Sequence, residues 1–239
     1  MSVRKKPRVF DAPRALTDAT VGVVLAVLLV VAVGTTTARV WVTDPHVTLL
    51  LTYLCVWVPL LGAVAVAWFW HGHTLRLLFR PLDLLWGLSI GLLARSVASA
   101  VEILGYGQMG TSAVTFGDTV YDAWWLFGAL LAPVLLAPVI EELFFRGLLL
   151  RSVLGVTRAN GGGRRASVAI AVLVSALVFA LVHMINTDTP TTAAVVGVST
   201  FVFGIGAGCL AALTSRLGGA IIAHITFNAL VVVPALLLP

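Results

Sequence analysis

Charge is scarce in this chain of 239 residues. Asp, Glu, Lys and Arg together make up 10% of it, whereas hydrophobic residues make up 60%. Such a composition excludes an ordinary soluble domain, in which about a quarter of the residues are charged. Cysteine is scarce as well, since Cys55 and Cys209 are the only two and each lies alone in an apolar stretch. They provide neither a disulfide framework nor a cysteine-based metal site, and we expect both to be small buried side chains.

Long apolar runs dominate the chain instead. A helix needs about 20 residues to cross a hydrocarbon core about 30 Å thick. Seven runs reach that length, which predicts an all-α fold: a polytopic transmembrane helical bundle of about seven or eight helices. An eighth span would arise if the fourth run formed two helices or if residues 105–120 re-entered the membrane. The seven runs are residues 17–38, 47–70, 82–104, 121–150, 166–185, 193–214 and 217–238.

Lysine and arginine occur mainly in alternate connections. They precede the first run and follow the second, fourth and sixth, whereas the other connections contain mostly Asp. Because cytoplasmic loops carry an excess of Lys and Arg, we predict a cytoplasmic basic N-terminus (residues 1–16) followed by a single transmembrane domain (residues 17–238). The arginines are spread over separate loops, so the sequence pI of 9.9 does not indicate nucleic-acid binding.

All three glutamates of the chain lie within apolar runs, as Glu102, Glu141 and Glu142. Charges at membrane depth are costly unless they are paired or face a polar cavity, so they indicate a functional site. Glu142 and Arg146 are four residues apart and can pair on one helix face. Glu141 is rotated about 100° from Glu142 and is left to face a cavity.

Two further polar pairs with helical spacing follow in later runs. Phe179 precedes His183 by four residues, so its ring is expected to pack beside the imidazole and hold the orientation of His183. His224 likewise precedes Asn228 by four residues. At 1.5 Å per residue from the bordering arginines, Glu141, His183 and Asn228 all lie about 15–25 Å deep, and His224 one turn shallower than Asn228. We therefore expect these side chains to converge.

Two chemistries suit this set. Glu141 could act as general base on a water molecule, with a histidine orienting the water and Asn228 binding the developing oxyanion. Alternatively, Glu141, His183 and His224 could ligate a zinc ion that holds the water. The metal-free version is preferred, because Asn228 suits an oxyanion donor better than a zinc ligand. Ser175 is expected to make an ordinary interhelical contact.

The series Glu141-Glu142-x-x-x-Arg146, Phe179-x-x-x-His183 and His224-x-x-x-Asn228 resembles the motifs of the CPBP intramembrane proteases. This family comprises type II CAAX prenyl endopeptidases, bacterial Abi proteins and lysostaphin-resistance proteins. The resemblance covers about residues 121–232 and implies a helical membrane fold with a conical polar cavity. It implies these roles: Glu141 as water activator, His183 and His224 as polarising or metal-ligating residues, Asn228 as oxyanion donor, and Glu142 and Arg146 as supporting residues.

The resemblance implies an intramembrane endopeptidase of a bacterial plasma membrane that cleaves membrane-associated peptides or proteins, with no certain cofactor and zinc as the open alternative. A non-catalytic bacteriocin-immunity or partner-binding scaffold of the same family is the main alternative. A proton-coupled transporter would use Arg95, Glu102 and Glu141 as a relay, but the halves of the chain lack broken-helix symmetry. Haem ligation by His183 and His224 would leave the carboxylates unexplained.

Overall fold

The computed structural model describes residues 9–37, 44–109, 122–185 and 187–237, and every secondary-structure element in these ranges is helical. The predicted all-α fold is therefore confirmed. The elements are α1 (Ala12–Thr37), α2 (Pro45–His71), α3 (Pro81–Tyr106), α4 (Ala123–Leu126), η1 (Phe127–Leu136), α5 (Ala137–Glu142), η2 (Leu143–Leu149), α6 (Leu150–Ala159), α7 (Arg164–His183), α8 (Pro190–Thr214) and α9 (Gly218–Leu237).

Six helical segments of the described chain are long and apolar enough to cross a membrane, and α9 adds a shorter apolar helix. Each of the seven predicted runs therefore coincides with a helix. The fourth run is a single segment, Ala123–Ala159, so it does not divide into two spans. The alternative source of an eighth span, re-entry of residues 105–120, falls largely on residues 110–121, which lie outside the described ranges.

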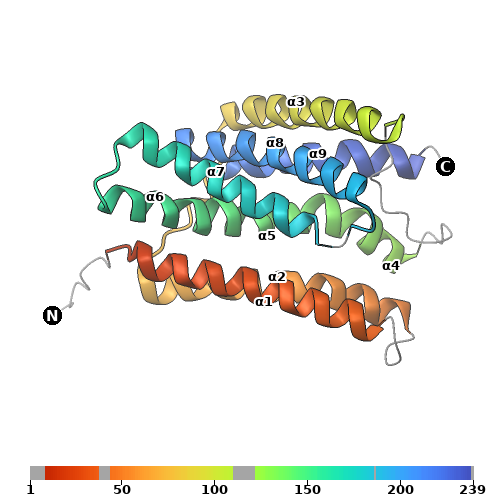
Figure 1. Ribbon diagram of the computed structural model, residues 1–239, viewed down its shortest axis with the longest axis horizontal. Coiled ribbons are helices and arrows are strands. Elements are labelled where there is room, and N and C mark those ends of the chain that lie inside the picture. Colours follow the sequence, from red (N-terminus) through yellow and green to blue (C-terminus); the bar gives the residue numbers. More distant parts are fainter. Residues whose placement is uncertain (1–8, 38–43, 110–121, 186, 238–239) are drawn as a thin grey trace.

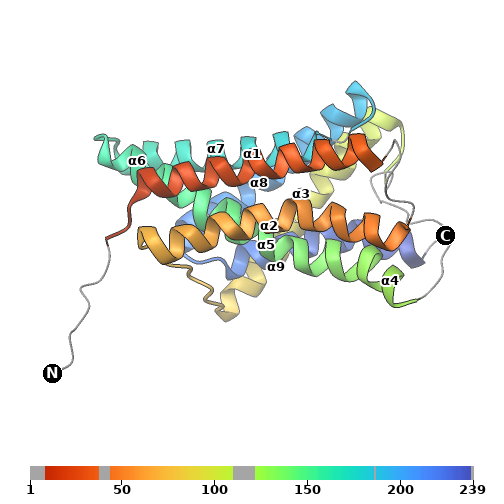
Figure 2. The same cartoon turned by 90° about the horizontal axis from the view of Figure 1, so that it is seen from below.

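The helices run roughly parallel to one another in layers (Figure 1). The pair α1–α2 forms one side, and Figure 2 shows this pair in front of the other helices. The segment from α4 to α6 lies next to this pair, followed by α7, α8 and α9. Helix α3 covers the opposite side, where it packs against α8 and α9.

The fourth span is unusual because two π-helical stretches, η1 and η2, flank the short helix α5. Pro133 lies inside η1 and Pro138 lies in the first turn of α5, and neither has a backbone N–H. The N–H of Ala137 bonds to the carbonyl of Ala132, five residues back. A π-register bond from residue 138 to Pro133 cannot form, so the Pro133 carbonyl is left for another donor. Such widened turns are rare in proteins overall, and those that occur are frequently found at functional sites.

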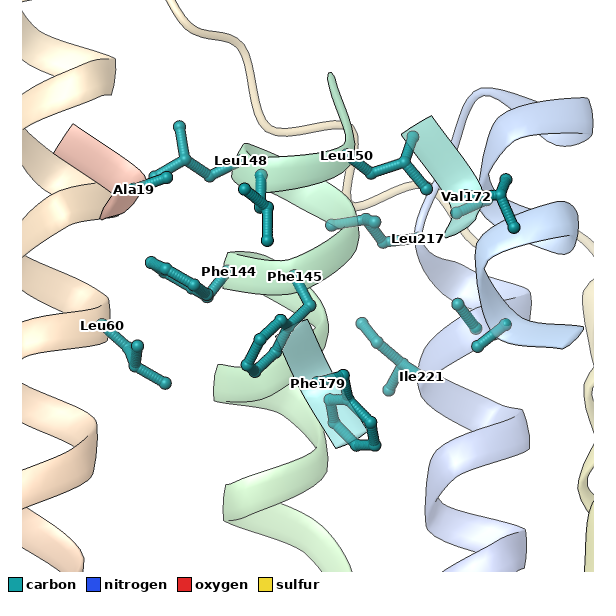
Figure 3. Packing of buried hydrophobic residues seen from close by; sticks show 14 of the residues in the cluster. Ala19, Leu60, Phe144, Phe145, Leu148, Leu150, Val172, Phe179, Leu217 and Ile221 are labelled. Atoms are coloured by element: carbon teal, nitrogen blue, oxygen red, sulfur yellow. The ribbon is translucent and has the colours of Figure 1, made fainter. Parts of the chain in front are cut away.

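Tight packing around η2 forms the centre of the core (Figure 3). Phe144 points toward Leu60 of α2, whereas Phe145 points toward Phe179 of α7 with ring centroids 5.0 Å apart. Phe144 and Phe145 are almost completely buried. In a membrane this packing stabilises the bundle mainly by van der Waals contact, because lipid tails are as apolar as the side chains that they would replace.

Polar contacts connect the loops at the basic end of the bundle. Arg216, between α8 and α9, donates to both carboxylate oxygens of Asp83 in the first turn of α3, at 2.7–3.1 Å. Arg151 of α6 donates to the carbonyl oxygens of Thr74 and Ser215 at 3.0 and 3.1 Å. The connections that carry most of the arginines therefore lie at one end of the bundle. On the basis of the positive-inside rule, we propose that this end of the bundle is cytoplasmic.

The two cysteines differ in their exposure. Cys55 is buried on α2, as predicted, but Cys209 is exposed on α8, so the expectation of burial was wrong for Cys209. An apolar neighbourhood in the sequence does not separate the two cases, because a membrane-spanning helix is apolar on its lipid-facing side as well as on its packed side.

Candidate active site

Three apolar helical segments bring the predicted catalytic side chains together. Glu141 lies near the end of α5, His183 is the last residue of α7, and His224 lies on α9. The Oε2 atom of Glu141 is 3.8 Å from Nε2 of His183 and also 3.8 Å from Nε2 of His224. The predicted convergence of these three residues is confirmed. At 3.8 Å neither contact is a direct hydrogen bond, and a bridging water is the usual link at such a separation.

The ion pair beside Glu141 is fully buried. Arg146 Nη1 donates to Glu142 Oε1 at 2.6 Å, and both side chains have 0% exposure. The guanidinium also lies over the rings of Phe179 and Phe203, at 4.6 and 5.4 Å from their centroids. The predicted pairing of Glu142 with Arg146 is confirmed, and each charge is compensated where an unpaired one would be strongly unfavourable.

Each histidine is oriented through its Nδ1 atom. His224 Nδ1 lies 2.9 Å from Glu142 Oε1, and His183 Nδ1 lies 2.8 Å from the carbonyl oxygen of Phe179. Because both of these oxygens accept hydrogen bonds, Nδ1 carries the donated hydrogen in each ring. Both Nε2 atoms are thereby directed toward Glu141. This is the usual means by which a neighbouring group fixes the tautomer and direction of a working imidazole.

Aromatic rings enclose the histidines. The ring of Phe179 lies 4.2 Å from that of His183 and 5.6 Å from that of His224, measured between centroids. Phe203 of α8 lies 4.6 Å from the ring of His224. The expected packing of Phe179 beside His183 is confirmed, whereas Phe203 was not predicted. Phe203 has no ionisable residue three or four positions away on its helix, so the sequence around it carries no signal that separates it from other core residues.

Asn228 lies one turn beyond His224 on α9 and bonds to the fourth span. Its Nδ2 donates to the carbonyl oxygen of Pro133 at 2.8 Å. This is the carbonyl that the π-helical register and Pro138 leave without a backbone donor. The bond fixes the amide and uses one of its two N–H groups, so the second remains for a substrate. The five-residue spacing of the two prolines was the available signal for this contact.

A cavity of about 320 Å³ adjoins the histidines. It is lined by His183, His224 and Asn228, by aromatic and aliphatic side chains, and by Arg95 and Glu102 of α3. Arg95 Nη2 lies 2.5 Å from Glu102 Oε2, and this ion pair forms within α3. Tyr53 of α2 also lines the cavity.

The carboxylate and the two histidines do not form a metal site as they are placed. Among the residues that the structure describes, no group of three or more His, Cys, Asp or Glu side chains could hold a metal ion. The two separations of 3.8 Å from Glu141 Oε2 also exceed the ligand–ligand spacing of about 3.3 Å that zinc bonds of about 2.0–2.1 Å imply for a tetrahedral site.

Comparison with known proteins agrees with this geometry. The family model described as type II CAAX prenyl endopeptidase Rce1-like matches residues 123–230. The matched segment contains every residue of the three motifs, from Glu141 to Asn228. No curated protein and no solved structure matches the chain. Over residues 123–230 the chain is thus similar to the Rce1-like type II CAAX prenyl endopeptidases, which supports the resemblance to the CPBP family of CAAX proteases.

Proposed function

We propose that the chain is an intramembrane endopeptidase in which Glu141 activates a water molecule for attack on a peptide bond. The observation that carries the proposal is the placement of the Glu141 carboxylate 3.8 Å from the Nε2 atoms of both His183 and His224. The adjoining cavity of about 320 Å³ provides space for a segment of the substrate. The substrate is a membrane-associated peptide or protein.

The reaction uses each group at a stated atom. The His183 Nε2 atom, whose lone pair is free when Nδ1 carries the proton, accepts a hydrogen bond from the water. Glu141 removes a proton as the water oxygen bonds to the scissile carbonyl carbon. The second amide N–H of Asn228 stabilises the resulting oxyanion. The carbon–nitrogen bond then breaks, and Glu141 returns the proton to the leaving amine.

The support for His224 comes from the buried ion pair. Glu142 Oε1 bonds to both Arg146 and His224, so one carboxylate oxygen holds the arginine and directs the imidazole. Glu142 and Arg146 are therefore positioning residues, and they do not react. The two adjacent glutamates thus have different proposed roles, because Glu142 is held in a buried ion pair whereas Glu141 faces the two histidines.

Glu141→Gln is the direct test. We expect it to lower peptidase activity at least about 10²- to 10⁴-fold, since an amide cannot act as general base. The unfolding temperature should stay near that of the wild type, because Glu141 has no direct hydrogen bond to lose within the described residues. Asp188→Asn, at an exposed acidic position, is the matched control and should retain activity. Quenched fluorescent peptides with a membrane-anchoring segment, prenylated or not, would report cleavage. Full activity in Glu141→Gln would refute the assignment.

Metal analysis tests the metal-free mechanism separately from the endopeptidase activity. We expect the chelated protein to remain active with substoichiometric metal and to show a bell-shaped dependence of activity on pH. Stoichiometric zinc that is lost together with activity in His183→Ala would overturn the metal-free mechanism. That result would leave the endopeptidase assignment in place.

A further inference from the structure

A second, larger cavity lies outside the active site, at the basic end of α6, α7 and α8. Its volume is about 940 Å³, and it shares no lining residue with the active-site cavity. It is an open groove between helices, formed where the chain turns from α6 into α7 and where α8 ends. The proposed reaction makes no use of it.

The wall of the groove is apolar and exposed. Leu173 of α7 is 50% exposed and Leu213 of α8 is 80% exposed. Cys209 lies one turn from Leu213 and is also exposed, while Val172 and Ile205 complete the deeper part of the wall. These side chains come from neighbouring faces of α7 and α8, which pack against each other.

The mouth of the groove is basic. Arg158 at the end of α6, and Arg164 and Arg165 at the start of α7, line it. All three are exposed, and none of them has an ion pair or a side-chain hydrogen bond with a described residue. The sequence contains no Asp or Glu between Glu142 and Asp188, so nothing in this part of the chain neutralises them.

The basic mouth and the apolar wall follow one another along the groove as the anionic headgroup and the acyl chains do in a phospholipid. Val172 lies seven residues beyond Arg165 on α7, or about 10 Å further from the basic end at 1.5 Å per residue. Guanidinium groups bind phosphate oxygens in paired hydrogen bonds, and basic pockets between transmembrane helices bind anionic headgroups. The apolar wall beyond them suits an acyl chain.

We propose that this groove is a binding site for an anionic phospholipid. The phosphate is bound by Arg158, Arg164 and Arg165, and one acyl chain lies along the groove between α7 and α8. The charge complementarity at the mouth selects an anionic lipid over a zwitterionic one. The proposal does not depend on the peptidase assignment, since the two cavities have separate walls.

The test measures lipid binding to the purified full chain in detergent. Native mass spectrometry and thermal unfolding would be followed during titration with phosphatidylglycerol or phosphatidylcholine of the same acyl composition. We expect selective retention of phosphatidylglycerol and a higher unfolding temperature with that lipid. The triple variant Arg158→Gln, Arg164→Gln, Arg165→Gln should lower the apparent affinity at least about tenfold, since each basic residue adds to the attraction of an anionic lipid headgroup. The matched control is the triple variant Arg14→Gln, Arg76→Gln, Arg80→Gln. It removes the same amount of charge at the same end of the bundle but outside the groove, so it should bind phosphatidylglycerol as the wild type does.

A second measurement locates the acyl chain. A fluorophore attached to the exposed Cys209 thiol should be quenched by phosphatidylglycerol with brominated acyl chains, and less by the brominated phosphatidylcholine. Equal binding of the two lipids, equal losses in the two triple variants, or the same stabilisation by inorganic phosphate alone would each overturn the proposal. The last result would indicate a site for a free anion, and a dimer formed without added lipid would indicate that a second copy occupies the groove.

Discussion

Replacing Arg146 by methionine is expected to destabilise the protein strongly while leaving the shape of the core nearly unchanged. The two side chains of the Glu142–Arg146 pair are both fully buried, and Nη1 lies 2.6 Å from Oε1. Methionine can fill the space between the rings of Phe179 and Phe203, so the main loss is the partner of the Glu142 carboxylate.

The magnitude follows from that isolated charge. Removing one member of a buried ion pair costs about 3–5 kcal/mol, because the remaining charge is neither solvated nor paired. Glu142 keeps one partner, His224 Nδ1 at 2.9 Å, which places the expected loss toward the lower end of that range. The exposed pair Arg14–Asp11 supplies the control, since its side chains are 74% and 38% exposed. Arg14→Met should change the stability by less than about 0.5 kcal/mol.

A double-mutant cycle distinguishes lost charge balance from lost packing. Glu142→Gln removes the other charge and keeps an oxygen that can accept from His224. The double variant Glu142→Gln, Arg146→Met should therefore lie within about 2 kcal/mol of the wild type, with a coupling energy of at least about 3 kcal/mol. Reversible unfolding in mixed detergent micelles would provide the four free energies. A double variant as unstable as the sum of the two single variants would refute the argument.

Three further outcomes are expected. Asn228→Ala should lower kcat about 10²- to 10³-fold with little change in KM, as the loss of one oxyanion donor does, in steady-state peptide cleavage. Gly91→Ala should lower the free energy of unfolding by about 1–3 kcal/mol, because a Cβ there would lie 2.7 Å from the Ala223 carbonyl oxygen, whereas Gly62→Ala, with open space around its Cβ, should not. Burial, with a smaller effect of the nearby Arg151 charge, lowers the pKa of His73 to about 4, below its unfolded value of about 6.5, so His73 should make the stability fall as the pH drops from 6.5 to 4. That contribution, roughly 2–3 kcal/mol, should be missing from His73→Gln in unfolding curves compared across this pH range.

Local spacing and membrane depth were sufficient to predict the centre of the site. The pairing of Glu142 with Arg146 follows from the geometry of one helix, and the structure contains it. Counting residues from the basic ends placed Glu141 and the two histidines at similar depth, and their facing atoms are 3.8 Å apart. Depth is predictable because every span has to cross the same hydrocarbon layer.

The contacts that the sequence did not reveal depend on how helices rotate and pack. The bond between Glu142 and His224 joins residues 82 positions apart, and no periodicity within either helix specifies it. The bond from Asn228 to the Pro133 carbonyl requires the π-helical register, which a pattern based on 3.6 residues per turn does not include. The exposure of Cys209 likewise depends on which face of α8 its neighbours cover.

The bond between Arg216 and Asp83 has a consequence for the order of assembly. It joins the start of α3 to the turn before α9, residues that are 133 positions apart. Helices inserted from the N-terminus place Asp83 long before Arg216 is synthesised, so until then its carboxylate has the local hydrogen bond from the Arg80 N–H but lacks the guanidinium. The same late segment carries His224 and Asn228. A nascent chain that has inserted its first six long apolar helices therefore has the proposed general base but neither the second histidine nor the proposed oxyanion donor, so the proposed peptidase activity would begin only when α9 docks.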